Sequence, residues 1–393
     1  MLVNEVFESI LGLNLNHKTE FVGLNLALKR VLANDIKATK DLPAYDNSAL
    51  DGYAFCYDDK DLALKIKGEI FAGDKNHYEI SKGECYKIMT GAIFPKGADS
   101  VLRIEESTLD NNGNLIIPSN ITPKDGKKLK GEEIKTGDII LKKGDILDAA
   151  KIMLLASQGI CFVEVFCKPK IAVFGTGNEL KEPWENCDER EIYNANSFGI
   201  VALLAQNGFD SEYKGTIKDE KNAILSEINS HKDYDLIITS GGASKGEADF
   251  MQEILLELGF REIFSKINLR PAGPSKLYEK DGKFVSILPG NPMSCFVGCF
   301  FSVLPLVKKM SGFNECLPNK TKCELKSSIK FKSTRANIVL GTLKNGEFIV
   351  FNNGEYSPAM INPLAISGAF YLSNIGESEI ESGSLIEVFE FDK

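Results

Sequence analysis

Three strand-like runs, each followed at once by a turn rich in glycine or proline, constrain the fold of this chain most strongly. KIAVF precedes GTGNEL (175–180), DLIITS precedes GGASKGEAD (241–249), and KFVSIL precedes PGNPMS (289–294). A helix-like stretch begins near Asn196, and other apolar helical stretches follow the second and third runs. This alternation predicts a doubly wound α/β domain over 168–312, whose ligands bind outside the C-terminal ends of its strands.

The rest of the chain is long enough for further domains. A length of 393 residues exceeds what one hydrophobic core usually reaches. Short strand-like runs between turn residues predict a β insert over 46–131 and a C-terminal β-barrel over 313–393. The stretch DAAKIMLLASQG (148–159) predicts an amphipathic helix that packs with N-terminal helices in 3–28. The resulting discontinuous helical domain comprises residues 1–45 and 132–167.

Composition and charge exclude several classes of partner. The formal net charge is −9 and no long basic run is present, so the sequence argues against a nucleic-acid partner. The nine cysteines form no CxxC pair and no histidine lies near them at ligand spacing, which indicates reduced thiols in a cytoplasm and no zinc site. The N-terminus lacks a signal-peptide pattern, and no apolar run is expected to reach the length of a membrane span.

The three turns at the predicted sheet edge form the candidate ligand site. Glycine lets the main chain approach a ligand closely and serine can donate to phosphate oxygens, so Gly241, Gly242 and Ser244 are candidate phosphate contacts. The alternative for any one turn is plain structural punctuation after a strand, but three turns at one edge favour a site. None of them matches the GxxxxGK[ST] or GxGxxG pattern.

Two carboxylates accompany these turns. Glu179 and Asp249 lie where an anion would otherwise be favoured, which makes sense if a hard divalent cation links them to phosphate. We therefore expect a Mg²⁺ site. The alternative is that each side chain only caps the helix that follows it.

The β insert opens with a dense group of polar side chains. Asp46, Asn47, Ser48 and Asp51 crowd into six residues of DLPAYDNSALDGYAF. Such a cluster is either a turn stabilised by side-chain hydrogen bonds or a polar site, and residue chemistry alone favours the turn. MTGAIFPKGAD (89–99) likewise reads as a hairpin connection.

Taken together, these segments resemble the molybdopterin molybdenumtransferase family, the molybdenum insertases that include the insertase domain of gephyrin. The resemblance covers nearly the whole chain. It rests on DNSALDGYA, MTGAIFPKGADSVLRIEE, GEEIKTGDIILKKG, KIAVFGTGNEL, IYNANS, DLIITSGGASKGEADF, RPAGPSKL and LPGNPMSCF, which occur in family order. One such segment would be weak, but the ordered set makes a chance resemblance untenable.

The resemblance implies a reaction and an assembly. Adenylylated molybdopterin and molybdate would give molybdenum cofactor and AMP, with Mg²⁺ as the cofactor. Each subunit would have four domains: a doubly wound α/β molybdopterin-binding domain, the inserted β domain, the discontinuous helical domain and the C-terminal β-barrel. The enzyme would be a cytoplasmic homodimer whose active cleft lies between the α/β domain of one subunit and the β insert of the other. The molybdopterin adenylyltransferase is an expected contact.

The motif match also implies roles for single residues. Catalytic roles fall to Asp51, Thr90, Glu179 and Asp249, and three of these, Asp51, Glu179 and Asp249, are the expected metal ligands. Arg270 and Lys276 are the nearest cations for molybdate, because a small oxyanion needs several charged donors. The residues expected to bind substrate are Asp46, Ser48, Asp219, Gly241, Gly242, Ser244, Arg270, Ser275, Lys276, Pro289, Gly290, Asn291, Pro292 and Ser294.

The chain departs from the family pattern in two segments. The family's PGKP reads PAGP at 271–274, so a usual lysine is absent and Lys276 is its candidate substitute. The family's GED segment reads GEE at 131–133, so its last carboxylate, that of Glu133, is one methylene longer.

The alternative functions are a tungstate-preferring paralogue, a molybdopterin carrier or scaffold without catalysis, and the related adenylyltransferase. The last is a single domain, so the β insert and the terminal barrel argue against it.

Overall fold

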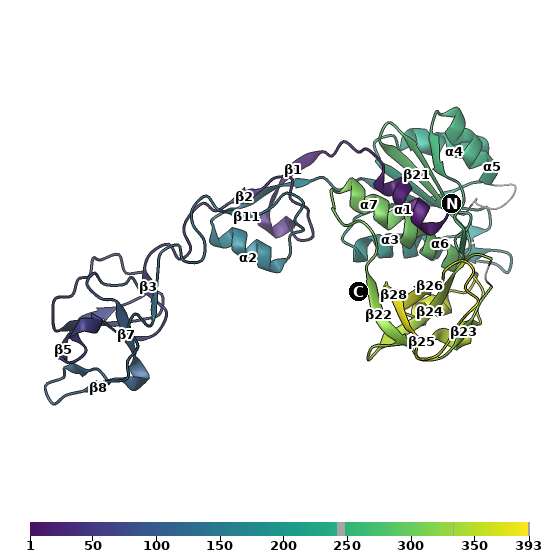
Figure 1. Cartoon of the computed structure of the whole chain (residues 1–393). Helices are drawn as coiled ribbons and strands as arrows, with labels where there is room; N and C mark the ends of the chain where they lie inside the picture. Colours follow the sequence, from purple (N-terminus) through teal and green to yellow (C-terminus); the bar gives the residue numbers. More distant parts are fainter. Residues whose placement is uncertain (242–247, 333, 392–393) are drawn as a thin grey trace. The chain divides into compact units, whose positions relative to one another are not determined.

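The computed structural model describes residues 1–241, 248–332 and 334–391, and the chain separates into two compact units. Unit 1 comprises residues 1–20, 29–33 and 164–393, and unit 2 comprises residues 21–28 and 34–163. Figure 1 shows the chain and labels many of the helices and strands of both units. Unit 1 holds the α/β domain together with the C-terminal barrel, whereas unit 2 holds the β insert.

The α/β domain of unit 1 is built on a six-stranded sheet of order β16-β13-β17-β21-β20-β18. The first four strands pair in parallel, and β20 and β18 are antiparallel additions. The strands are β13 (Ile171–Thr176), β16 (Glu212–Ile217), β17 (Leu236–Ser240), β18 (Arg261–Phe264), β20 (Lys276–Lys280) and β21 (Lys283–Leu288). This arrangement confirms the predicted doubly wound domain.

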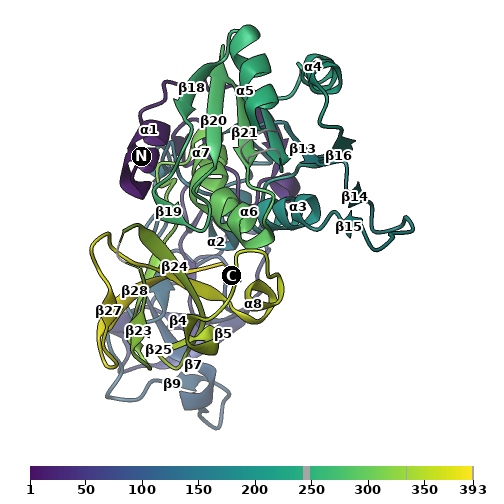
Figure 2. The same ribbon diagram turned by 90° about the vertical axis from the view of Figure 1, so that its right-hand side faces the viewer.

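Helices cover both faces of this sheet (Figure 2) because its strands bury side chains in both directions. Ile171 and Val173 of β13 face one core, with the buried residues of α3 (Asn196–Gln206). Ala172 and Phe174 alternate to the other core, which includes α4 (Lys221–Ser230) and α5 (Ala248–Glu257). The apolar run KIAVF is therefore a strand buried on two faces.

One long apolar helical segment crosses the first of these cores. It consists of α6 (Pro292–Gly298), a π-helical turn (Cys299–Val303) and α7 (Leu304–Met310). Pro292–Met310 is the one described helix long and apolar enough to cross a membrane, so the expectation that no run reaches that length is wrong. Most of the segment is buried in the protein, as in a core helix. Cys295 and Cys299 are buried in it, and all nine cysteines of the chain are unpaired.

The N-terminal helix α1 (Val3–Leu11) belongs to unit 1 and packs against α7. Its buried face joins the core of the α/β domain, where the ring of Phe7 lies 6.1 Å from that of Phe301. The prediction that 148–159 packs with N-terminal helices in 3–28 is therefore wrong. Beyond α1, that stretch forms a strand and one 3₁₀ turn (Leu24–Leu26).

The C-terminal part of unit 1 is a closed five-stranded barrel, as predicted. Its strands follow the order β24-β25-β22-β28-β26, and pairing of β24 with β26 closes the ring. The short strand β19 (Leu269–Arg270) from the α/β domain adds to β24 in parallel. The barrel region contains β22 (Lys320–Leu325), β23 (Ile329–Lys330), β24 (Ala336–Lys344), β25 (Glu347–Val350), α8 (Asn362–Ile366), β26 (Ala369–Leu372), β27 (Glu379–Ile380) and β28 (Leu385–Glu390).

Unit 2 contains the predicted β insert as a six-stranded sheet of order β7-β4-β6-β5-β9-β8. Its strands are β4 (Gly52–Phe55), β5 (Ala63–Ile70), β6 (Glu84–Ile88), β7 (Ser100–Arg103), β8 (Thr108–Leu109) and β9 (Leu115–Ile116). The predicted helix is α2 (Ala149–Ser157), whose first turn is capped by the Asp148 carboxylate accepting from the Lys151 N–H at 2.8 Å. Short pairs join β2 (Ile36–Lys37) to β11 (Ile139–Leu141), β3 (Asn47–Ser48) to β10 (Lys127–Lys128), and β1 (Thr19–Gly23) to β12 (Phe162–Phe166). The predicted domain boundaries stay predictions.

Candidate functional site

A cleft of about 580 Å³ lies at the C-terminal ends of β13, β17 and β21 in unit 1. All three predicted turns contribute to it. Apolar and polar side chains share the lining, and the barrel region adds Ala359 and Ile361. Its full lining is Thr176, Glu179, Leu180, Ile192, Tyr193, Asn194, Ala195, Asn196, Ser240, Gly241, Pro274, Pro289, Gly290, Asn291, Pro292, Ala359 and Ile361.

Gly241 lets two of these turns approach each other closely. Its φ of 104° lies in the left-handed region, which glycine adopts readily. A β-carbon at this position would clash with the carbonyl oxygen of Thr176 and would lie 2.6 Å from the Thr176 hydroxyl oxygen. That hydroxyl donates to the Ser240 carbonyl at 3.1 Å. Glycine is therefore required at 241 by the packing of the cleft floor, whether or not the residue also contacts a ligand.

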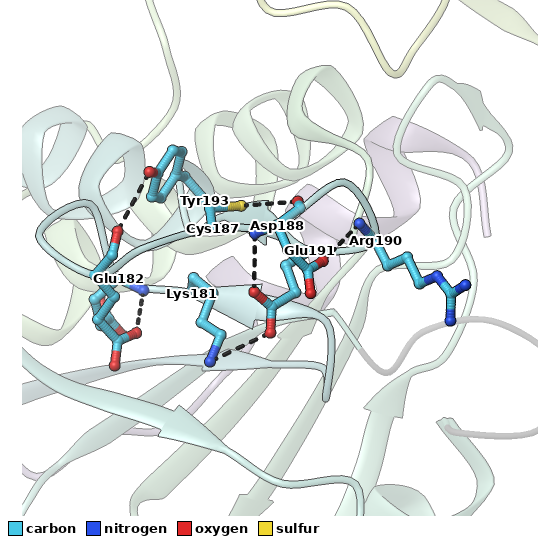
Figure 3. Close-up of polar contacts among 8 residues, drawn as sticks. Lys181, Glu182, Cys187, Asp188, Arg190, Glu191 and Tyr193 are labelled. Atoms are coloured by element: carbon cyan, nitrogen blue, oxygen red, sulfur yellow. Dashed lines mark hydrogen bonds and ion pairs between the residues drawn. The ribbon is translucent and has the colours of Figure 1, made fainter.

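An excursion between β13 and α3 (residues 177–195) forms one rim of the cleft. Its two short strands, β14 (Leu180–Lys181) and β15 (Ile192–Tyr193), pair in parallel. Figure 3 shows how polar contacts brace the connection between them, including the ion pair of Lys181 with Glu191 at 3.3 Å. The Ile192 N–H donates to the Glu179 carbonyl at 3.0 Å, so the backbone that carries Glu179 is tied to β15.

A hydrogen-bonded network of uncharged and charged groups anchors this excursion. The Tyr213 hydroxyl donates to the Glu182 carboxylate and accepts from the Asn194 amide at 2.8 Å. Thr216 donates to the same Glu182 oxygen at 3.1 Å. Burial, assisted by the hydrogen bond to the Glu182 carboxylate, raises the pKa of Tyr213 to about 12. The phenol is therefore neutral and holds the excursion to β16 at physiological pH.

The start of α3 is also tied to the cleft. The Asn194 side-chain oxygen accepts from the Ser197 N–H at 3.2 Å and so satisfies a backbone donor in the first turn of α3. Asn196 is the first helical residue, as the sequence predicts, and its amide donates to the Gly290 carbonyl at 2.7 Å. This bond links α3 to the turn PGNP.

The cleft gathers some of the predicted substrate residues but leaves others apart. Ser275 is fully buried, and its hydroxyl donates to the Ala272 carbonyl at 2.9 Å. Ser294 is buried in α6, and Asp219 lies beyond the end of β16. Those that line the cleft are Gly241, Pro289, Gly290, Asn291 and Pro292, and Glu179, predicted as a catalytic residue and metal ligand, lines it with them. Gly242, Ser244 and the side chain of Asp249 lie outside the described part of the structure.

The two predicted cations lie in different surroundings. Lys276 is buried at the start of β20, and its ammonium donates to the Gln252 side chain at 2.9 Å. Arg270 is exposed and lines a second pocket of about 280 Å³, together with Lys330 and Lys332. Lys330 also forms an ion pair with Glu379 at 3.3 Å. Positive charge therefore collects around Arg270 more than around Lys276.

In unit 2, Asp51 and Thr90 form a direct pair. The Thr90 N–H and hydroxyl both donate to the same Asp51 oxygen at 2.6 Å. These hydrogen bonds hold the pKa of Asp51 below its usual value, because they stabilise the ionised carboxylate. Both residues are exposed, so the pair presents a fixed negative charge to solvent.

The neighbouring polar cluster is used largely within the chain. The Asp46 carboxylate accepts from the Lys130 N–H at 2.9 Å and pairs with the Lys127 ammonium at 3.1 Å, and these contacts lower its pKa. Ser48 is buried, and its hydroxyl donates to the Leu50 carbonyl at 2.6 Å. These contacts support the turn interpretation for Asp46 and Ser48 and distinguish both from the exposed Asp51.

Comparison with known proteins gives the same result in sequence and structure. Residues 1–159 match the MoeA N-terminal region (domain I and II), and residues 172–309 match a probable molybdopterin binding domain. A protein of Staphylococcus epidermidis named molybdopterin molybdenumtransferase is 30% identical over 98% of this chain and 94% of its own. The chain belongs to the molybdopterin molybdenumtransferase family. It is thus a transferase of molybdenum cofactor biosynthesis.

Further members of the family agree. A molybdopterin molybdenumtransferase of Haemophilus influenzae is 35% identical over 75% of this chain and 74% of its own. The crystal structure of the molybdopterin biosynthesis MoeA protein from Pyrococcus horikoshii superimposes with a TM-score of 0.83 at 26% identity. It covers 100% of this chain and 99% of that one. The fold of this transferase is thus the MoeA fold along its whole length.

Several residues that line the cleft of this transferase are not among those predicted from the sequence. Thr176, Tyr193, Asn194 and Asn196 all face it, and IYNANS (192–197) is the segment that carries the last three. That segment supports the family resemblance, yet no single residue in it is predicted as a site residue. Its short strand and lack of charge give no signal of chemistry.

One carboxylate of the predicted metal site, that of Glu179, lies in the cleft. The described residues hold no group of three His, Cys, Asp or Glu side chains arranged to bind a metal ion. Glu179 is exposed at the cleft, and its carboxylate has no hydrogen bond or ion pair to the described residues. Carboxylate oxygens suit a hard divalent cation. The Glu179 carboxylate therefore fits as one ligand of such a cation. The side chain of Asp249, the expected second ligand, lies outside the described part of the structure.

Proposed function

We propose that this transferase inserts molybdate into adenylylated molybdopterin and releases AMP. The observation that carries the proposal is the cleft itself, where the exposed carboxylate of Glu179 joins three glycine- and proline-rich turns at one sheet edge. Its volume of about 580 Å³ lies in the range of small-ligand sites. The relatives' name, molybdopterin molybdenumtransferase, supports the pterin as substrate.

A Mg²⁺ ion is part of the proposal. Glu179 would be one ligand and Asp249 another, with Asp51 as a third candidate. When bound, the cation would supply positive charge to the phosphoanhydride and stabilise the departing AMP. Main-chain N–H groups near Gly290 would orient phosphate oxygens, because glycine leaves the backbone accessible. The N–H of Gly241 itself donates to the Leu288 carbonyl at 3.0 Å, so Gly241 would contribute close approach of the backbone and not a donor.

The Asp51–Thr90 pair is proposed to complete the site from the β insert of a second copy. A homodimer with a shared cleft supplies the reason for an exposed, permanently ionised carboxylate in unit 2. Asp51 would orient the attacking oxygen or the metal. Thr90 would fix the Asp51 carboxylate through its two hydrogen bonds.

The oxyanion is proposed to enter beside Arg270. The PAGP segment leaves no lysine at 273, and Lys276 is buried and bound to Gln252. Arg270 instead shares a pocket with Lys330 and Lys332, and several cationic donors are what a dianion requires. Arg270 is therefore the preferred candidate for molybdate, whereas Lys276 is proposed to hold α5 against β20.

The test is an AMP-release assay. The purified protein is incubated with adenylylated molybdopterin and Mg²⁺ while molybdate and tungstate are titrated in parallel. We expect release that depends on the oxyanion and is stronger with molybdate. Stronger release with tungstate would assign the tungstate-preferring alternative. Tight pterin binding without release would refute catalysis and favour a carrier or scaffold. Direct contact with an adenylyltransferase is tested separately by titrating that enzyme.

A further inference from the structure

Among the residues that the structure describes, the aromatic side chains near the cleft form a packed group and leave one ring outside it. The ring of Trp184 meets that of Phe198 edge-on with centroids 6.2 Å apart, and Phe198 lies 5.1 Å from Tyr213. Tyr193 lines the cleft and is 49% exposed. Across residues 1–241, 248–332 and 334–391, the Tyr193 ring has no aromatic partner.

The position of Tyr193 is nevertheless fixed. β15 pairs with β14, and the Asn194 N–H donates to the Lys181 carbonyl at 2.8 Å. The Tyr193 hydroxyl donates to the Glu185 carbonyl at 3.3 Å, across the excursion drawn in Figure 3. A ring held at its backbone and at its hydroxyl loses little conformational freedom when it contacts a ligand.

We propose that Tyr193 is the stacking wall for a flat heteroaromatic ring of the substrate. The inference deepens the proposed function, on which it rests, because adenylylated molybdopterin carries two such rings, adenine and the pyrimidine ring of the pterin. A half-exposed ring in a cleft contributes most binding free energy when a flat ligand stacks on it and displaces water from its face. The nearby apolar lining, Leu180, Ile192 and Pro292, suits the same ligand. Tyr193 thus selects for the flat part of the substrate rather than for its phosphates.

The experiment measures affinity by calorimetry for two probes, AMP and molybdopterin without the adenylyl group. Tyr193→Leu removes the ring, and we expect about a tenfold loss of affinity for the probe whose ring stacks there. Tyr193→Phe keeps the ring and should bind within about twofold of the unmodified protein. Trp184→Leu, a matched change to an exposed aromatic that does not line the cleft, should leave both affinities unchanged.

Each outcome decides the inference. Loss of AMP affinity alone assigns adenine, and loss of molybdopterin affinity alone assigns the pterin ring. The inference is overturned if Tyr193→Leu changes neither affinity, if Tyr193→Phe loses as much as Tyr193→Leu, or if Trp184→Leu does the same. Failure of the unmodified protein to bind either probe overturns it too. AMP release by the unmodified protein tests the proposed function separately, so a failure of one is distinguishable from a failure of the other.

Discussion

Gly241→Ala should strongly destabilise unit 1, whereas Gly290→Ala in the same cleft should not. At 241 the new methyl group would overlap the Thr176 carbonyl and displace the hydroxyl that donates to Ser240. At 290 the nearest atom to the methyl group would be the α-carbon of Gly241 at 3.6 Å, which is ordinary van der Waals contact. The two substitutions thus add the same atom to neighbouring turns in opposite steric conditions.

The magnitude follows from two additive causes. A left-handed φ costs an alanine about 1–2 kcal/mol, and insertion of a methyl group into a packed site costs about 1–3 kcal/mol. Gly241→Ala should therefore lower the free energy of unfolding by about 2–5 kcal/mol. For Gly290→Ala we expect a change of less than about 1 kcal/mol, because a Gly to Ala change at a permissive position mainly reduces the entropy of the unfolded chain.

Thermal unfolding by scanning calorimetry measures both variants in the same transition. At about 2–4 °C per kcal/mol for a body of this size, Gly241→Ala should lower the midpoint by about 4–20 °C. The midpoint of Gly290→Ala should stay within about 4 °C of the unmodified protein. Equal midpoints for the two variants would refute the assignment of Gly241 as a sterically required glycine.

Three further results are expected. Asp51→Asn should slow AMP release by at least about 100-fold while calorimetric pterin binding stays unchanged, and full activity would remove Asp51 from the mechanism. Tyr213 has a folded-state pKa of about 12 against an ordinary 10.0, so its contribution to stability is complete below pH 10 and is lost as pH rises toward 12. Urea unfolding should show that Tyr213→Phe loses less of its free energy of unfolding between pH 10 and pH 12 than the unmodified protein does. Identical pH profiles for the two proteins would contradict this. Chelation of Mg²⁺ should abolish AMP release without moving the unfolding midpoint, whereas release in excess chelator would exclude the metal.

The architecture around the cleft is predictable from sequence because its signal is local. KIAVF, DLIITS and KFVSIL are short apolar runs that end in glycine or proline, and parallel strands of this kind bring their C-terminal ends to one edge. Glu179, Gly241 and Pro289 could therefore be placed together from the sequence. The order of the β insert and barrel could be read from turn residues in the same way.

The remaining features depend on partners that are distant in sequence. The pattern of α1 shows which of its faces is apolar but not which surface buries it. Lys276 and Arg270 are both cations near one motif, and only the tertiary structure separates a lysine bound to Gln252 from an exposed arginine. Tyr193 lies in an excursion braced by side-chain contacts, and no periodic pattern reports such contacts.

The packing of α1 against α7 has a consequence for synthesis on the ribosome. α1 ends at Leu11 and α7 begins at Leu304, so about 290 residues are translated between them. At roughly 5–20 residues per second, α1 waits about 15–60 s for its partner. During that time its apolar face, which includes Phe7 and Ile10, has no core to enter. The nascent chain is therefore a natural client for a chaperone that binds short apolar helices at the tunnel exit.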